Sequence, residues 1–269
     1  MSHRDVGSRR LKLARALGDA LATLPRLWIG AAGVLALLLA ACLAPVLVEA
    51  LGTASAGTTG AAVVLAVVAI GALARLSITP TLKAARDLGL GPLGLQFRWP
   101  ELRLVGAALL CLIFLAMIVS VLGVIVLAIA GGAELNVEAI RARDWAAVGA
   151  PWRLAVVGAV VAGALIIPLV LTVRLSLFAH ATLGRRQMVS LNSMGIAYGS
   201  FWALLLGLII VNLPKIGLFT LIAGGVLGGV TASVVGAITL VAVQLPLTMA
   251  FLGAAYRQLE YWSPEEGSA

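Results

Sequence analysis

Long apolar runs are the feature of this sequence that most restricts its fold. An α-helix needs roughly 20 residues to cross the hydrocarbon core of a bilayer, at about 1.5 Å per residue over roughly 30 Å. Inside a membrane each backbone N–H and C=O group must be paired within the protein, so runs of this length are expected to be helices. The predicted spans are residues 27–48, 60–78, 104–130, 154–177, 201–221 and 230–255.

The composition of the whole chain supports this interpretation. Hydrophobic residues make up 62% of its 269 residues and charged residues only 11%, whereas soluble proteins are roughly 45–50% apolar and about 25% charged. A water-soluble shell could not cover so much apolar surface. The sequence therefore predicts an all-α fold, a polytopic transmembrane helix bundle of about six spans with interfacial amphipathic helices.

Lysine and arginine are distributed unevenly between the two sides of the predicted bundle. With the N-terminus inside, fifteen of these residues flank the cytoplasmic ends of spans and four lie in the outer connections. This asymmetry follows the positive-inside rule and predicts an even number of crossings, with both termini cytoplasmic. The expected organisation is a cytoplasmic basic amphipathic segment at 1–26, a six-span membrane domain at 27–257 and a cytoplasmic tail at 258–269.

The net charge of +8 indicates membrane lipids rather than nucleic acid as the partner. A nucleic-acid site gathers basic residues with aromatic and polar groups on a soluble face, whereas here the basic residues flank apolar runs. Arginine side chains at such positions can snorkel to anionic headgroups. The candidate headgroup contacts are Arg75, Arg86, Arg98, Arg103, Arg174, Arg185 and Arg186.

Residues 8–26 have the pattern of an interfacial helix. Leucines recur every three or four positions on one side, while Lys12, Arg15 and Asp19 fall on the other. Such a helix would lie on the cytoplasmic leaflet; the alternative is a solvated basic arm. The leucines are Leu13, Leu17, Leu21 and Leu24.

Small residues recur every four positions in the first span and at the start of the sixth. Lipid provides no hydrophobic driving force for helix association, so dispersion contacts between closely approaching backbones must stabilise the helix pair. We expect these stripes to seal the bundle internally; the alternative is a face for a second copy or a partner subunit. The stripes are Ala32, Ala36, Ala40 and Ala44, and Gly225, Gly229, Ser233 and Ala237.

Reactive groups suited to catalysis are scarce. The spans hold no paired carboxylates, no metal-ligand cluster and no Gly-x-Ser-x-Gly motif. Ser176 and His180 share a helical face, but no orienting acid or oxyanion donor accompanies them. Cys42 and Cys111 are isolated within apolar runs, which predicts buried thiols. We therefore predict no enzymatic activity, no catalytic residue, no cofactor and no bound metal.

Polar groups in the span interiors are also few. Coupled transporters usually need intramembrane charges for ion or proton relays, and the predicted span cores hold none. Asn212 and Gln244 form the candidate intramembrane polar site. Asn212 lies with Pro214 and Lys215 in the outer half of the fifth span, where a kink is expected, and Gln244 lies near Pro246 in the sixth span.

A weak repeat connects the two halves of the chain. One span ends in Arg75-Leu76-Ser77-Ile78, and 99 residues later another ends in Arg174-Leu175-Ser176-Leu177. An amphipathic segment and a further span follow each copy. Duplication of a helix, surface segment and helix unit explains this order; chance also explains it, since arginine is expected at a cytoplasmic helix end.

The second copy also carries a family resemblance. After Arg174 the chain reads Arg-Leu-Ser-Leu-Phe-Ala-His-Ala, then Leu-Asn-Ser from Leu191, and Tyr-Gly-Ser-Phe-Trp-Ala-Leu-Leu from Tyr198. This stretch resembles a family of bacterial six-helix membrane proteins that includes the YciC-like proteins and the membrane domain fused to some glycerophosphoryl diester phosphodiesterases. Met194 stands where that family has tryptophan. The resemblance implies a bacterial inner-membrane location and a non-catalytic membrane module, because the phosphodiesterase activity belongs to a separate soluble domain.

These observations favour a non-enzymatic inner-membrane protein that acts as a scaffold, an accessory subunit or a lipid-interacting module. Its expected partners are anionic lipid headgroups on the cytoplasmic side and either other membrane subunits or a second copy. The alternative is a transporter or lipid-handling channel for an uncharged or lipidic substrate, with its site near Asn212 and Gln244.

Overall fold

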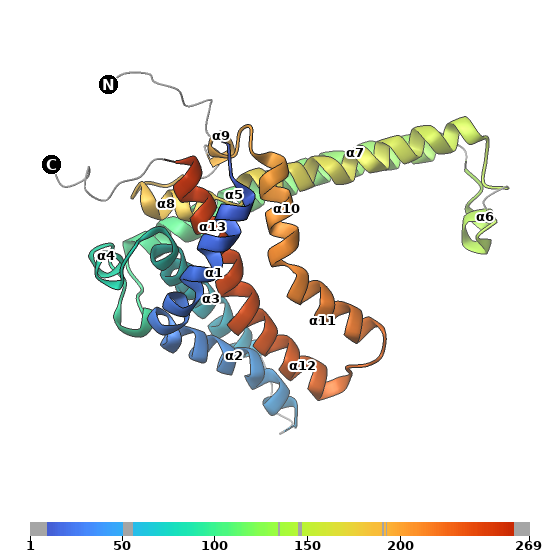
Figure 1. Ribbon diagram of the computed structural model, residues 1–269. Helices are drawn as coiled ribbons and strands as arrows, with labels where there is room; N and C mark the ends of the chain where they lie inside the picture. Colours follow the sequence, from blue (N-terminus) through green and yellow to red (C-terminus); the bar gives the residue numbers. More distant parts are fainter. Residues whose placement is uncertain are drawn as a thin grey trace, which may run out of the picture. The chain divides into compact units, whose positions relative to one another are not determined.

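A computed structural model describes residues 10–50, 56–133, 135–144, 147–189, 191 and 193–260. Every regular element in these ranges is a helix (Figure 1). The start of the expected basic segment, residues 1–9, and most of the expected tail, residues 261–269, lie outside the described residues. The elements are α1 (Leu13–Gly30), α2 (Ala32–Ala50), α3 (Ala56–Ile78), α4 (Leu82–Asp87), η1 (Pro92–Gly94), α5 (Trp99–Gly132), α6 (Val137–Ala142), α7 (Pro151–Leu175), α8 (Phe178–Gly184), α9 (Ser193–Ile196), α10 (Phe201–Val211), α11 (Leu213–Ala223), α12 (Gly229–Ile238), η2 (Thr239–Gln244) and α13 (Leu245–Leu259).

The helices confirm an all-α membrane fold with about six spans. Four helical segments, Thr59–Ile78, Pro92–Gly132, Pro151–Gly184 and Gly229–Leu259, are long and apolar enough to cross a membrane. Two bent pairs bring the number to six if each is one span. The first pair is α1 with α2, bent by 80°, and the second is α10 with α11, bent by 50°.

The bend between α10 and α11 lies where the sequence predicts it. Asn212 separates the two helices, and Pro214 stands in the first turn of α11. Proline has no N–H to donate to the preceding turn, so the helix bends where it enters. The predicted break in the fifth span is therefore confirmed.

The chain forms two compact units. Unit 1 comprises the described residues up to Ala108 and from Arg174 onward, and unit 2 runs from Leu109 to Val173. Unit 2 contains most of α5 and α7 and the short helix α6 between them. Apolar side chains such as Leu112, Val124 and Leu165 are exposed on its two long helices, as expected of surfaces that face lipid.

Helix α1 packs lengthwise along α13 in unit 1. The Lys12 N–H donates to Gln258 Oε1 (3.0 Å), and the indole N–H of Trp28 donates to the Ala242 carbonyl (2.8 Å). Because Ala242 lies in η2, directly before α13, helix α1 runs antiparallel to η2 and α13.

The face of α1 that packs against α13 is distinct from the leucine face, which the sequence predicts to contact the lipid leaflet. Ala16, Ala20 and Leu27 are fully buried, whereas Leu21 is 60% exposed. Small alanine side chains allow α1 to approach α13 closely, and the leucines are left at the edge of the contact. The amphipathic helix α1 packs on the bundle, and its contacts with the neighbouring helix decide which of its faces is buried.

The small-residue stripes do not seal the interior, contrary to our expectation. Ala32, Ala36 and Ala40 are exposed, and Ala44 is half-buried. Larger side chains face inward instead, because they bury more apolar area against α3 and α12; these are Val34, Leu35 and Leu38. The second stripe is likewise turned outward, with Gly225, Gly229 and Ser233 exposed and Ala237 half-buried.

Two glycines bring helices close to α13. A Cβ atom at Gly207 of α10 would lie 2.0 Å from Cζ of Phe251, and one at Gly253 would lie 2.4 Å from Cβ of Ser77. Phe251 is fully buried. These contacts fix the spacing between α13 and both α10 and α3.

Substitution of Gly207 by alanine tests this packing. We expect Gly207→Ala to lower the stability of unit 1 by about 1–3 kcal/mol, because the new methyl group overlaps the Phe251 ring. The measurement is the thermal unfolding of the purified protein in detergent. The control is Gly217→Ala in α11, where a Cβ atom meets nothing within 4 Å; an equal loss of stability in both variants would contradict the close approach.

Candidate functional site

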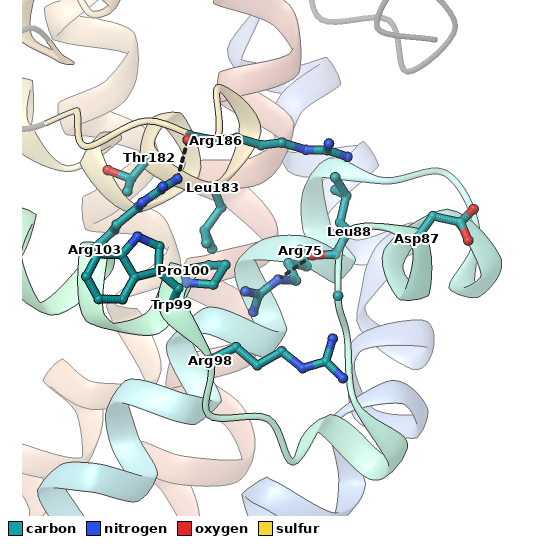
Figure 2. Close-up of a pocket in the computed structure, with 11 residues that line it drawn as sticks. Arg75, Asp87, Leu88, Arg98, Trp99, Pro100, Arg103, Thr182, Leu183 and Arg186 are labelled. Atoms are coloured by element: carbon teal, nitrogen blue, oxygen red, sulfur yellow. Dashed lines mark hydrogen bonds between the residues drawn. The ribbon is translucent and has the colours of Figure 1, made fainter.

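A basic cavity of about 420 Å³ opens in unit 1 at the end of α3 (Figure 2). Its walls come from the last turn of α3, the segment after α4, the first turn of α5, and α8. Four of the seven arginines that the sequence singles out line it. They are Arg75, Arg98, Arg103 and Arg186.

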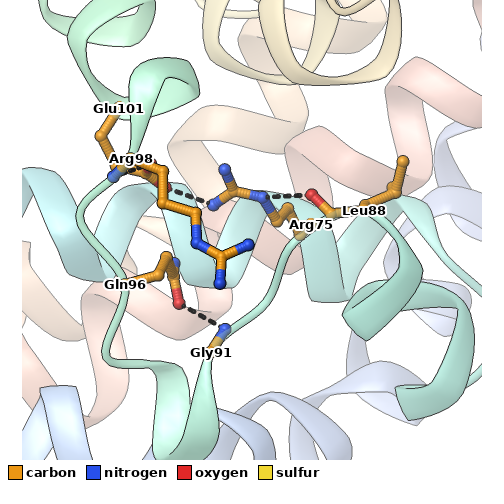
Figure 3. A network of polar contacts seen from close by, with 6 residues as sticks. All are labelled: Arg75, Leu88, Gly91, Gln96, Arg98 and Glu101. Carbon is orange, nitrogen blue, oxygen red and sulfur yellow. Dashed lines mark hydrogen bonds and ion pairs between the residues drawn. The ribbon is translucent and has the colours of Figure 1, made fainter.

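A buried ion pair lies at the inner end of this cavity. Arg75 Nη1 is 2.6 Å from Glu101 Oε1, and the two side chains are 2% and 0% exposed. Arg75 Nε also donates to the Leu88 carbonyl (3.1 Å), as Figure 3 shows. Burial of a charge carries a large desolvation cost unless the charge is paired and hydrogen-bonded. The pair therefore ties the end of α3 to the start of α5 and to the loop after α4.

Glu101 is held in position by the helix that it begins. It occupies the third position of α5, and its Oε2 accepts a hydrogen bond from the Arg98 backbone N–H (2.9 Å). This is the reciprocal half of a capping box, in which a glutamate reaches back to the N-cap. This hydrogen bond to the backbone fixes the position of the carboxylate that pairs with Arg75.

Two further contacts shape the surroundings of the ion pair. A Cβ atom at Gly71 would lie 3.3 Å from both Arg75 Nη1 and Glu101 Oε1, so glycine leaves the space that the pair occupies. Gln96 Oε1 accepts from the Gly91 N–H (3.1 Å) and closes the loop that leads into α5 (Figure 3).

The remaining arginines give the cavity an excess of positive charge. Arg98 and Arg186 are exposed and Arg103 is half-buried, while Arg103 Nη1 donates to the Arg186 carbonyl (2.6 Å). Since Glu101 neutralises Arg75, these three face a single lining carboxylate, Asp87. An anion is the ligand that such a cavity favours.

Exposed aromatic side chains adjoin the cavity. Trp99 lines it and is 63% exposed, and Phe97 is 61% exposed. Tryptophan concentrates at the level of lipid headgroups, where its ring meets both apolar chains and water. Basic and aromatic groups thus meet where α5 begins.

The other predicted headgroup arginines have different surroundings. Arg86 is exposed on α4 and does not line the cavity. Arg185 forms an ion pair with Glu260, and Arg174 is half-buried. Arg75 itself is too deeply buried to snorkel, contrary to our expectation, because its partner Glu101 holds it inside.

Glu101 is the residue of this site that the sequence analysis missed. The signal was present, since Trp99-Pro100-Glu101 follows Arg98 with glutamate at the third helical position and proline in the first turn. The pairing with Arg75 had no such signal, because it joins residues 26 positions apart in different helices.

The two candidate intramembrane polar residues lie together. Gln244 Nε2 donates to Asn212 Oδ1 (3.1 Å) and to Thr248 Oγ1 (2.8 Å). Gln244 ends the π-helix η2, and such bulges often mark functional positions. The pair does not line the basic cavity or the two other cavities found here, of which one lies in unit 1 and one in unit 2.

His180 is part of the core of unit 1. It is fully buried, and its Nε2 lies 3.1 Å from Ser77 Oγ and 3.2 Å from the Met249 carbonyl. Because the Ser77 hydroxyl donates to Ala74, the imidazole N–H donates to both groups. His180 therefore joins α8 to α3 and α13 in the interior.

In the part of the chain that the structure describes, no group of three His, Cys, Asp or Glu residues is placed to hold a metal ion. Cys111 is buried and Cys42 half-buried.

Comparisons with protein-family models, curated proteins and solved structures found no match to this chain. The resemblance to the six-helix bacterial family stays a prediction.

Removal of the Glu101 charge tests the ion pair. We expect Glu101→Gln to lower stability by about 3–5 kcal/mol, because the amide keeps the cap on α5 but leaves the Arg75 charge buried and unpaired. Thermal unfolding in detergent measures the loss. Arg75→Met in the same chain is expected to restore part of it; a double variant no more stable than Glu101→Gln would contradict the pairing.

Proposed function

We propose that this protein is a non-enzymatic membrane protein that binds the phosphate groups of anionic phospholipids in its basic cavity. The single observation that carries the proposal is that Arg98, Arg103 and Arg186 all line one cavity (Figure 2). These residues come from two segments that are more than eighty positions apart in the sequence.

The chemistry of the cavity suits a phosphate diester. A guanidinium group presents paired N–H donors that match two phosphate oxygens. The lining also includes Trp99, Leu88 and Leu183, which offer apolar contact to the glycerol and the first acyl carbons. Because the cavity combines charge with apolar surface, it favours a lipid headgroup over a free ion as its ligand.

In our proposal this cavity lies on the cytoplasmic side, as the distribution of lysine and arginine favours, and the membrane is the bacterial inner membrane that the family resemblance implies. Anionic lipids give that leaflet a negative surface potential, which attracts basic residues near the bilayer. A lipid held in the cavity would make the protein a lipid-interacting module, and the exposed stripes on α2 and α12 leave room for a partner subunit.

Passage of an uncharged or lipidic substrate is the alternative. Its candidate site is the hydrogen-bonded pair of Asn212 and Gln244. The pair lines none of the three cavities described above, whereas the arginines line one of them. We place lipid binding first because the arginines line an observed cavity.

Replacement of the cavity arginines tests the proposal. We expect Arg98→Gln, Arg103→Gln and Arg186→Gln each to weaken retention of phosphatidylglycerol relative to phosphatidylcholine by about fivefold, since one basic residue near an anionic surface contributes about 1 kcal/mol. Native mass spectrometry of the purified protein in mixed micelles measures the bound lipids.

Arg86→Gln is the matched control. It removes the same charge from an exposed position on α4 outside the cavity. Retention of phosphatidylglycerol by this variant should equal that of the unmodified protein. If Arg86→Gln weakens binding as much as Arg98→Gln does, the attraction is a diffuse charge effect and the cavity is not a site.

A further inference from the structure

A second cavity in unit 1, of about 640 Å³, has charges of both signs. It lies between α1, the turn that follows α3, and the last turns of α13. Asp19 and Arg26 reach it from α1, and Arg257 reaches it from α13. We call it the mixed-charge cavity. It shares no lining residue with the basic cavity.

Arg26 is fixed at the edge of this cavity by the end of α3. Its Nη2 donates to the Leu76 carbonyl (2.9 Å), and its Nη1 donates to the Pro80 carbonyl. The last carbonyls of a helix have no partner within the helix and carry partial negative charge, so an arginine is favoured there. The Nε of Arg26 is buried and has no hydrogen-bond partner within the described residues.

Arg257 is less completely satisfied. Its Nη1 is buried and finds no hydrogen-bond partner in the part of the chain that the structure describes. Arg26 and Arg257 both line this cavity, and two guanidinium groups at one cavity favour an anion that offers several oxygens, as a phosphate does.

Asp19 restricts the ligand further. It lines the same cavity as Arg26 and Arg257. A carboxylate repels a simple anion, but it attracts a primary ammonium group and accepts its N–H donors. A ligand with a phosphate at one end and an ammonium at the other meets both requirements.

We propose that the mixed-charge cavity binds a phosphate diester that carries a primary ammonium group, the chemistry of an aminophospholipid headgroup. Arg26 and Arg257 hold the phosphate oxygens, and Asp19 accepts hydrogen bonds from the ammonium. A trimethylammonium group has no N–H to donate, so a choline headgroup loses the contact with Asp19. The site is independent of the basic cavity, whose arginines favour a purely anionic group.

Competition between two lipids tests this proposal. The full chain, purified and equilibrated in micelles with equal amounts of phosphatidylethanolamine and phosphatidylcholine, is expected to retain the first about tenfold more, as a charge-assisted hydrogen bond allows. Native mass spectrometry counts the bound lipids. Asp19→Asn should abolish this preference, and Arg257→Gln should weaken retention of both lipids.

Two variants control for charge and folding. Glu138→Gln removes a carboxylate from an exposed position on α6 that lines none of the three cavities, and it should leave the preference unchanged. Ala22→Phe places a ring at an exposed lining position of the mixed-charge cavity and removes no charge, so it should block retention of phosphatidylethanolamine in a protein that unfolds at the same temperature.

The source of the headgroup is distinguished by adding soluble phosphoethanolamine. Displacement of the bound lipid shows that the headgroup alone suffices, and failure to displace it shows that the acyl chains are also needed. The proposal is overturned if the unmodified protein retains both lipids equally, if Asp19→Asn keeps the preference, or if Glu138→Gln removes it. These outcomes leave the basic cavity untouched, because they involve a different lipid class and different residues.

Discussion

The buried ion pair of Arg75 and Glu101 is the interaction on which the arrangement of the basic cavity depends. Neither charge is stable in this interior alone, because desolvation of an unpaired ion costs several kcal/mol. Together they join α3 to α5, and the cap on α5 fixes the carboxylate in advance. The pair also removes Arg75 from the charge available to a ligand and leaves three arginines for that task.

The last turns of α3 connect this pair to the rest of unit 1. Arg75 faces the basic cavity, Ser77 meets His180, and the carbonyls of Leu76 and Pro80 bind Arg26. Successive residues on a helix point in directions about 100° apart, so a short segment reaches several neighbours. One helix end thereby positions side chains of both cavities, which explains why it is rich in polar groups although the chain is so apolar.

The sequence was sufficient for the fold class because the length of an apolar run and the requirement for backbone pairing leave few alternatives in a membrane. The break at Asn212 was also predictable, since proline acts locally. The helix faces that are buried in the interior could not be predicted from the sequence. The alanine stripe on α2 follows helical spacing, yet Val34 lies on the buried face, because the shape of the neighbouring helix decides which residues are covered.

The candidate site was predictable only in part, for a similar reason. Clustering of arginine at the ends of spans is visible in the sequence, and four of those arginines do line one cavity. That Arg75 is paired while Arg98 and Arg186 are exposed depends on contacts between distant segments. Glu101 had a local capping signal, whereas its electrostatic partner can be identified only from the folded chain.

A structure determined by electron cryomicroscopy in nanodiscs that contain phosphatidylglycerol tests the central claim most directly. We predict phosphate density within hydrogen-bond distance of at least two of Arg98, Arg103 and Arg186, with Arg75 still paired to Glu101. A cavity that is closed by its own side chains, with lipid phosphates ordered only elsewhere on the bundle, would contradict the account.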